Sequence, residues 1–276
     1  MHQSILVYRN LRYLKWATAL TVLALVAYIA HQPGGVPNGG TWLGYTLGTI
    51  GAVLILWLTW FGIRKRRYGP GRVKLEDWLS AHVYLSLSLI IVATLHTGFQ
   101  FGINVHTLAY GLMIAVIASG AFGVYAYIRY PRLMTENRRG ETLQQMMAKL
   151  ADLDRESREA AVRLPDAYAN AVMRASEGLR LGGSVWTQLK GGPKRDATDV
   201  ALEEITTRAR GDQGADSAAL HRLLTLMTQK RELLARARKD IQFKAVMDIW
   251  LYVHVPLTLG LLAALTAHIV SVFFYW

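Results

Sequence analysis

Five apolar runs, each close to or above the length that a helix needs to cross a bilayer, constrain this 276-residue chain more than any other feature. They lie at about 14–31, 42–63, 79–101, 107–129 and 249–274. A hydrophilic block of more than a hundred residues separates the last two runs. The sequence therefore predicts an all-α, polytopic membrane protein with five transmembrane helices.

The hydrophilic block divides the chain into three predicted regions. Residues 1–130 hold transmembrane helices one to four, residues 131–247 form a cytoplasmic helical insert, and residues 248–276 hold the fifth span. Within the insert, apolar residues recur at helical spacing and predict a helical hairpin or small bundle, one option being that its last helix continues into the fifth span. The predicted stripes are Leu143, Met147, Leu150 and Leu153, then Leu220, Leu223, Leu224, Met227 and Leu234. Glycine-rich stretches near 182–199 and 210–216 are predicted loops.

The distribution of basic residues predicts the orientation in the membrane. Every Lys and Arg lies between positions 9 and 15, 64 and 74, or 129 and 244, whereas the 31–41 and 100–106 connections carry no charged side chain. Because positive residues mark the cytoplasmic side, we expect the N-terminus and the insert in the cytoplasm and the C-terminus in the periplasm of a bacterial inner membrane. The net charge of +12 then reflects topology and contact with lipid, and nucleic acid is not an expected partner.

The N-terminus has basic residues followed by an apolar stretch, as a signal peptide does. The run is long and ends without a small-x-small cleavage site, so an uncleaved first span is the expectation. Cysteine is absent, which excludes disulfides, iron–sulfur clusters and covalently attached haem within this chain. The insert has neither a dinucleotide fingerprint nor a phosphate loop, so no nucleotide site is expected there.

Two of the apolar runs each carry a pair of histidines. Residues 78–96, WLSAHVYLSLSLIIVATLH, and residues 250–268, WLYVHVPLTLGLLAALTAH, agree at nine of nineteen positions, both histidines included. The pairs are His82 with His96 and His254 with His268, each fourteen residues apart. Fourteen residues along an α-helix move a side chain by about 21 Å and turn it by roughly 40°. Each helix is thus predicted to present two imidazoles on one face at opposite membrane depths.

Ionisable side chains inside a membrane are costly and usually functional, and four histidines in matched pairs need a common explanation. Haem iron takes neutral imidazoles on both axial positions in centres suited to electron transfer. Both runs cross from inside to outside, so we expect His82 to pair with His254 at an inner haem and His96 with His268 at an outer haem. The predicted cofactors are two non-covalent haem b groups, and a quinone is a further candidate.

At these four histidines the sequence resembles the di-haem membrane cytochromes b, most of all the ferric-reductase-like transmembrane domain shared with NADPH oxidases. The segments HVYLSLSLIIVATLH and HVPLTLGLLAALTAH carry the resemblance, which covers about 160 membrane residues. It implies that the third and fifth spans ligate both haems in a four-helix core. Respiratory cytochrome b and the cytochrome b561 group use similar paired helices. Here no sixth span or flavin and nicotinamide domain follows, and a helical insert precedes span five.

Other residues admit two interpretations each. His106 and His31 are interfacial histidines or parts of a quinone or donor site near the outer haem, and His2 and His221 are expected in solvent. Trp78 and Trp250 belong to an aromatic belt or lie beside the inner haem. Three further sets of residues also admit two interpretations each. The glycines allow close helix packing or leave room for a porphyrin (Gly44, Gly48, Gly51, Gly111, Gly120, Gly123). The hydroxyls orient haem ligands or bond to their own helix (Ser86, Ser88, Thr94, Thr258, Thr266), and the basic residues orient the chain in the membrane or reach haem propionates (Arg64, Lys65, Arg66, Arg67, Arg72).

The predicted function is electron transfer across the membrane as one subunit of a redox complex. Expected partners are membrane lipid, companion redox subunits on the cytoplasmic or periplasmic side, among them a c-type cytochrome, and a quinone. Two alternatives stay open. One is an oxidoreductase that oxidises quinol or reduces a metal by itself, and the other is a non-redox membrane anchor or sensor that uses the helical insert.

Overall fold

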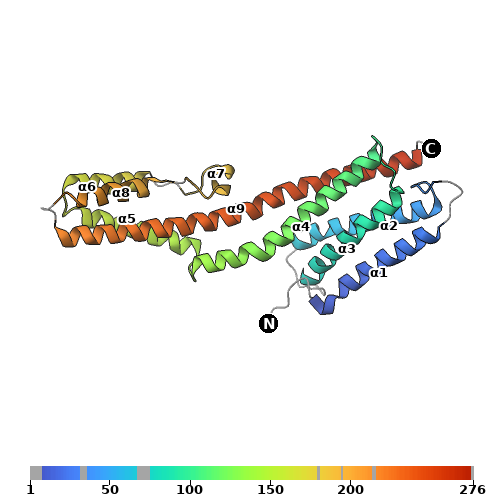
Figure 1. The fold of residues 1–276 in the computed structure, drawn as a ribbon, viewed down its shortest axis with the longest axis horizontal. Coiled ribbons are helices and arrows are strands. Elements are labelled where there is room, and N and C mark those ends of the chain that lie inside the picture. The colour runs from blue at the N-terminus through green and yellow to red at the C-terminus, as the bar shows by residue number, and fades with distance from the viewer. Residues whose placement is uncertain are drawn as a thin grey trace. The chain divides into compact units, whose positions relative to one another are not determined.

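The computed structural model describes residues 8–31, 36–66, 75–178, 181–193, 195–212 and 216–274. Within these ranges the chain forms nine helices and no strand, which confirms the all-α prediction (Figure 1). It divides into two compact units, Met1–Gly123 with Leu251–Trp276 and Val124–Trp250. Each unit is described by itself below.

Five helices are long and apolar enough to cross a membrane, as predicted. They are α1 (Tyr8–Ala30), α2 (Trp42–Arg66), α3 (Leu75–Thr97), α4 (Val105–Arg138) and α9 (Ser217–Phe274). Two of them extend far beyond the predicted spans. Helix α4 continues past position 129 and through Pro131, and α9 is one helix of 58 residues that begins in the insert and includes the whole fifth span.

An apolar core joins α2, α3, α4 and α9 within the first unit. Its buried members are Ile55, Leu58, Leu89, Met113, Leu261 and Leu265. Helix α1 packs against α2 and α3 through a second cluster that includes Ala24, Leu47 and Val92. Large apolar side chains such as Leu23, Val53 and Leu259 are 60–68% exposed on the outer faces of these helices. A surface of this kind suits lipid, so four helices enclose the core while their outer faces remain available to the bilayer.

A short connection between α3 and α4 determines where their facing ends lie. Gly98 and Phe99 both adopt positive φ, and the N–H of Gly98 donates to the Leu95 carbonyl at 3.1 Å. The Thr97 hydroxyl accepts from the N–H of Phe99 at 3.1 Å. Because the chain reverses this sharply, the last turn of α3 and the first turn of α4 come close together.

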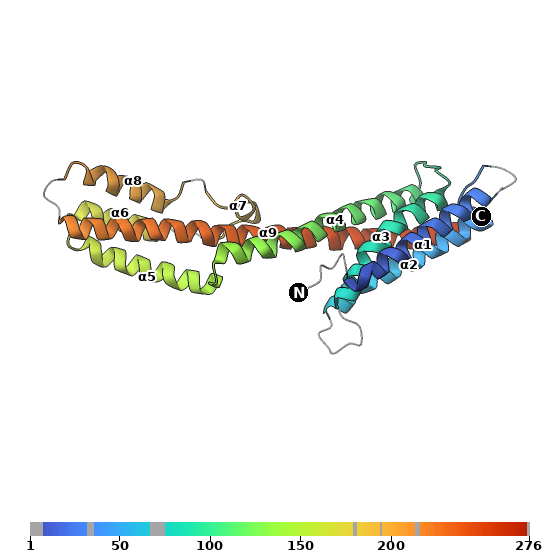
Figure 2. The same cartoon turned by 60° about the horizontal axis from the view of Figure 1, so that its bottom comes forward.

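The second unit is a helical bundle, as expected for the insert. Helices α5 (Leu143–Ala161), α6 (Asp166–Glu177) and α8 (Ala197–Ala209) lie along the amino-terminal part of α9 (Figures 1 and 2). Capping boxes begin α5 at Thr142 and α8 at Asp196. The short helix α7 (Val185–Leu189), capped by Ser184, lies in a stretch that was expected to be a loop.

Two apolar clusters hold this bundle together. One joins α5, α6, α8 and α9 around the fully buried Tyr168 and Met227, and the other packs Met146 and Leu150 of α5 against α9. The predicted α5 stripe was wrong at Met147, which is 42% exposed. Met146 occupies the buried position instead, because it lies four residues before Leu150 and shares its face.

Two arginines join the end of α4 to α9 and add to the apolar packing of the second unit. Arg138 at the end of α4 makes two hydrogen bonds to the buried Asp240 of α9, at 2.6 and 2.9 Å. Arg236 donates to the carbonyls of Asn137 and Arg138, the last residues of α4. These donors satisfy carbonyls that a helix end leaves without partners.

Candidate functional site

The structure brings together the histidines that the sequence pairs. Helix α3 carries His82 and His96, and α9 carries His254 and His268. The ring centroids of His96 and His268 are 6.1 Å apart. His82 and His254 lie close enough to interact electrostatically. The two helices therefore bring the rings of His96 and His268 close together, and His82 and His254 lie nearer the other ends of the same two spans.

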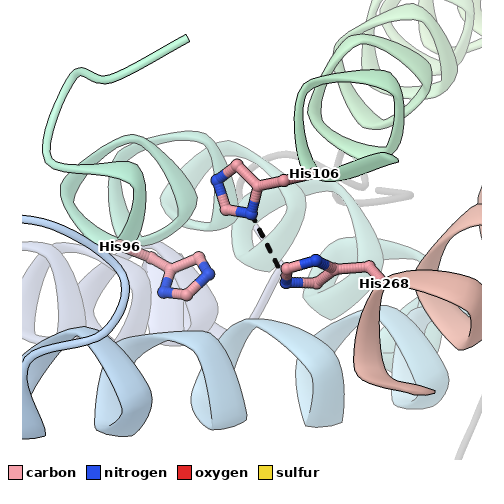
Figure 3. Close-up of side chains that lie close together, drawn as sticks. All are labelled: His96, His106 and His268. Carbon is pink, nitrogen blue, oxygen red and sulfur yellow. Dashed lines mark hydrogen bonds between the residues drawn. The ribbon is translucent and has the colours of Figure 1, made fainter. Parts of the chain in front are cut away.

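A third histidine joins the level of His96 and His268. His106, in the first turn of α4, has its ring centroid 5.1 Å from that of His96 and 4.7 Å from that of His268. Its Nδ1 lies 3.4 Å from Nε2 of His268. The three rings converge from three different helices (Figure 3), and one ligand atom from each lies within 4.8 Å of the others. We call His96, His106 and His268 the three-histidine cluster.

Helix α2 holds the His96 ring in place. Nδ1 of His96 lies 2.7 Å from the Gly44 carbonyl, and because a carbonyl only accepts, Nδ1 carries the proton. A Cβ on Gly48 would lie 2.7 Å from Cε1 of the same ring, and one on Gly39 would lie 3.2 Å from it. Gly48 therefore allows α2 to approach the imidazole. The Nε2 lone pair of His96 is left for a metal.

Ser119 of α4 holds His254 in a similar way. The Ser119 hydroxyl donates its single hydrogen to the Val116 carbonyl at 2.8 Å, and its oxygen lies 2.7 Å from Nδ1 of His254. Ser119 therefore fixes the position of the His254 ring. A metal-ligating histidine typically donates its other N–H to a fixed oxygen in this manner.

His82 lies in an aromatic and buried environment. Its ring centroid is 5.0 Å from that of Phe61, and one turn earlier Trp78 stacks on Trp57 at 4.8 Å. Within the described part of the chain, Nδ1 of His82 and Nε1 of Trp78 are buried without a hydrogen-bond partner. A buried imidazole nitrogen without a protein partner is compatible with a ligand at this level.

Comparisons with family models, curated proteins and solved structures find no match for this chain.

The spacing of the rings fits two kinds of metal centre. Metal–nitrogen bonds of roughly 2 Å on opposite faces of one iron place two imidazole centroids roughly 6 Å apart. The separation of 6.1 Å between His96 and His268 agrees with that value. In a tetrahedral site, bonds of this length separate ligand nitrogens by roughly 3.4 Å. The 3.4 Å between His106 and His268 agrees with the second arrangement.

The five serine and threonine hydroxyls that the sequence singles out do not orient the histidines. All five that the sequence singles out donate to a carbonyl of their own helix, namely Ser86, Ser88, Thr94, Thr258 and Thr266, at 2.7–2.9 Å. The glycines differ among themselves. Gly44 and Gly48 allow close approach, whereas a Cβ on Gly111 would meet no atom within 4 Å.

The other residues considered from the sequence lie outside the three-histidine cluster. The His31 ring packs edge-on against Trp42 at 5.3 Å, and His221 is exposed, as expected. His2, Arg67 and Arg72 lie outside the described residues, as do the side chains of positions 64–66. Sequence analysis missed the parts played by Gly44, Ser119 and His106. Only the position of His106 at the end of its span gave a signal.

Proposed function

We propose that this protein carries electrons across a bacterial inner membrane through two haem b groups. His82 and His254 would ligate the inner haem, and His96 and His268 the outer one. The observation that supports this most is the pairing of His96 on α3 with His268 on α9, whose ring centroids are 6.1 Å apart, with Nδ1 of His96 bonded to the Gly44 carbonyl and its Nε2 left for iron.

The residues around the rings suit this role. A haem with two imidazole ligands supplies one-electron chemistry without an open position for oxygen. The Gly44 carbonyl fixes the tautomer of His96 and raises the basicity of its Nε2, and the Ser119 hydroxyl holds the ring of His254. Between the two levels, the packed apolar residues Leu89 and Leu261 exclude water. The chain thus holds two of the four proposed ligands, His96 and His254, by hydrogen bonds inside a low-dielectric core.

The charge pattern supplies the direction of the chain in the membrane. Basic residues lie around the N-terminus, the 64–74 connection and the insert, and this pattern supports a cytoplasmic position for these parts and a periplasmic C-terminus. Because the sequence has no flavin, cluster or nucleotide motif, the proposed donor and acceptor are other redox subunits, such as a periplasmic c-type cytochrome, or a quinone. The insert would then be a docking element for a cytoplasmic partner.

The direct test is a reduced-minus-oxidised spectrum of the purified full chain with haem quantified per polypeptide. We expect low-spin b-type bands, close to two haems, and loss of about one haem in His82→Ala and in His254→Ala. The double variant His96→Ala, His268→Ala should lose the other. His31→Ala is the matched control, because His31 lies in neither pair. A colourless chain, as a non-redox anchor or sensor would give, contradicts the proposal.

Quinol oxidation by the chain alone is tested in the same preparation. A short-chain quinol added to the oxidised protein should reduce both haems if the chain has its own quinone site. If reduction needs an added partner, the chain acts as an electron-transfer subunit. Both outcomes keep the haem assignment and separate the two redox functions.

The 3.4 Å separation of nitrogens favours one second candidate, a single transition-metal ion held by the three-histidine cluster. Three imidazoles with an open fourth position suit zinc or copper. Metal analysis of the haem-free chain distinguishes this candidate. One ion per chain, lost in His106→Ala, would favour it over an outer haem.

A further inference from the structure

We propose that the outer iron has one fixed axial ligand, His96, and two imidazoles, His268 and His106, that exchange on its opposite face. This inference rests on the proposed haem function and extends it to the role of His106. It follows from three features of the three-histidine cluster: which ring is held, how close the other two rings are, and where they lie in their helices.

His96 is the held ring. Its Nδ1 bonds to the Gly44 carbonyl at 2.7 Å, and Gly48 and Gly39 surround Cε1 so closely that the ring has little room to turn. His106 and His268 are held differently. Among the described residues, the one side-chain hydrogen bond of either ring is the 3.4 Å contact with the other. The protein therefore orients one ligand and leaves two to compete.

The cluster is too tight for all three rings to stay in place around a porphyrin. Two imidazoles on opposite faces of a haem need roughly 6 Å between centroids, which His96 and His268 provide at 6.1 Å. His106 is nearer to both, at 5.1 and 4.7 Å, and so lies beside the space between them. Either His106 or His268 must move aside when a porphyrin lies against His96.

Both competing residues can make that movement without disrupting a helix. His106 is the second residue of α4, whose first turn is capped by Asn104: the Thr107 N–H donates to Oδ1 of Asn104 at 2.8 Å and the Leu108 N–H donates to its carbonyl at 3.1 Å. The movement of His106 is therefore a turn of its imidazole about the side-chain bonds, which leaves these backbone bonds in place. His268 lies one to two turns before the described end of α9 at Phe274. The position opposite His96 can thus be filled from α4 or from α9.

Single and double variants of the full chain test the exchange, with haem per polypeptide and the low-spin signal in electron paramagnetic resonance as readouts. In His96→Ala we expect the outer haem to be lost. In His268→Ala we expect close to two haems, both low-spin, with a changed outer signal and a shifted outer midpoint potential, because His106 replaces the missing ligand. In His106→Ala, His268→Ala we expect the outer low-spin signal to disappear.

The inner haem, ligated by His82 and His254, reports in every variant whether the chain has folded. Loss of the outer haem in His268→Ala to the same extent as in His96→Ala would overturn the exchange, and so would a high-spin outer haem in His268→Ala. Retention of a low-spin outer haem in the double variant would overturn it as well. A wild-type chain without haem would instead overturn the proposed function, so the two failures are distinguishable.

Discussion

At the scale of single residues, Gly48 determines whether His96 has a place to lie. A methyl group here would be 2.7 Å from Cε1 of the ring, a distance at which the imidazole or α2 must move. We therefore expect Gly48→Ala to weaken binding of the proposed outer haem and to reduce haem per chain from about two toward one. Gly51→Ala is the matched control on the same helix, because its new Cβ would meet only Cδ1 of Leu89, at 3.7 Å. Equal haem content in both variants would contradict this role of Gly48.

The buried pair of Lys230 and Asp154 makes the second residue-scale prediction. The Lys230 side chain is fully buried and bonds to Asp154, which also accepts from Ser176 at 3.0 Å. Removing one member of such a pair leaves an uncompensated buried charge, so Asp154→Leu should lower the free energy of unfolding by about 3–5 kcal/mol. The double variant with Lys230→Met should recover most of that loss. Urea unfolding of the full chain in detergent, with proteolysis of the insert as the readout, measures the free energy of unfolding of both variants. Equal stability of the single and the double variant would count against the argument.

At the scale of elements, α6 and α8 are joined by an ion pair that makes their packing depend on pH. Nη2 of Arg174 donates to Glu204 at 2.7 Å, and this hydrogen bond lowers the pKa of the Glu204 carboxyl below its ordinary value. A lowered folded-state pKa adds stability that is present above the unfolded value of about 4.3 and is lost as the pH falls through the folded value.

Glu204→Gln should therefore remove a small part of the acid dependence of unfolding below pH of about 4.3. The change should stay under about 1 kcal/mol, because both side chains are partly exposed to solvent. Glu232→Gln, which changes an exposed carboxylate of α9, is the control. Parallel pH profiles for the wild type and Glu204→Gln would show that the pair contributes nothing.

The elements also show what sequence patterns can and cannot predict about the site. The repeat in α3 and α9 predicts which histidines share a level, because equal spacing on two parallel helices leaves few other pairings. His106 belongs to no repeat and reaches the cluster only through the sharp reversal at Gly98 and Phe99. The partner of His96 is a backbone carbonyl, at Gly44, and no side-chain pattern identifies such an acceptor.

At the scale of the whole molecule, the fold class and the five spans follow from composition and run length. The boundaries were harder to predict. Helix α9 continues without interruption from Ser217, because its polar and apolar parts both have helical periodicity. The phase of α5 could not be predicted from the apolar pattern alone, since Met146 and Met147 are equally apolar neighbours and only packing against Leu233 and Leu234 selects one of them.

The charge asymmetry makes a prediction for the whole molecule. If the insert lies in the cytoplasm, trypsin should cleave it in inside-out vesicles, for example after the exposed Lys190, and should spare it in right-side-out vesicles. The 31–41 and 100–106 connections, which are expected on the opposite side of the membrane, contain neither Lys nor Arg and so have no trypsin cleavage site. Cleavage of the insert in intact right-side-out vesicles would reverse the proposed orientation.

The hydroxyl groups along α3 and α9 have a consequence for charge movement through this membrane unit. Each of the five singled out is tied to a carbonyl of its own helix and cannot turn freely toward a passing charge. An interior with few rotating dipoles rearranges little when a nearby centre gains or loses an electron. If electrons cross this unit as proposed, stiff local bonding of this kind would keep the barrier to their transfer low.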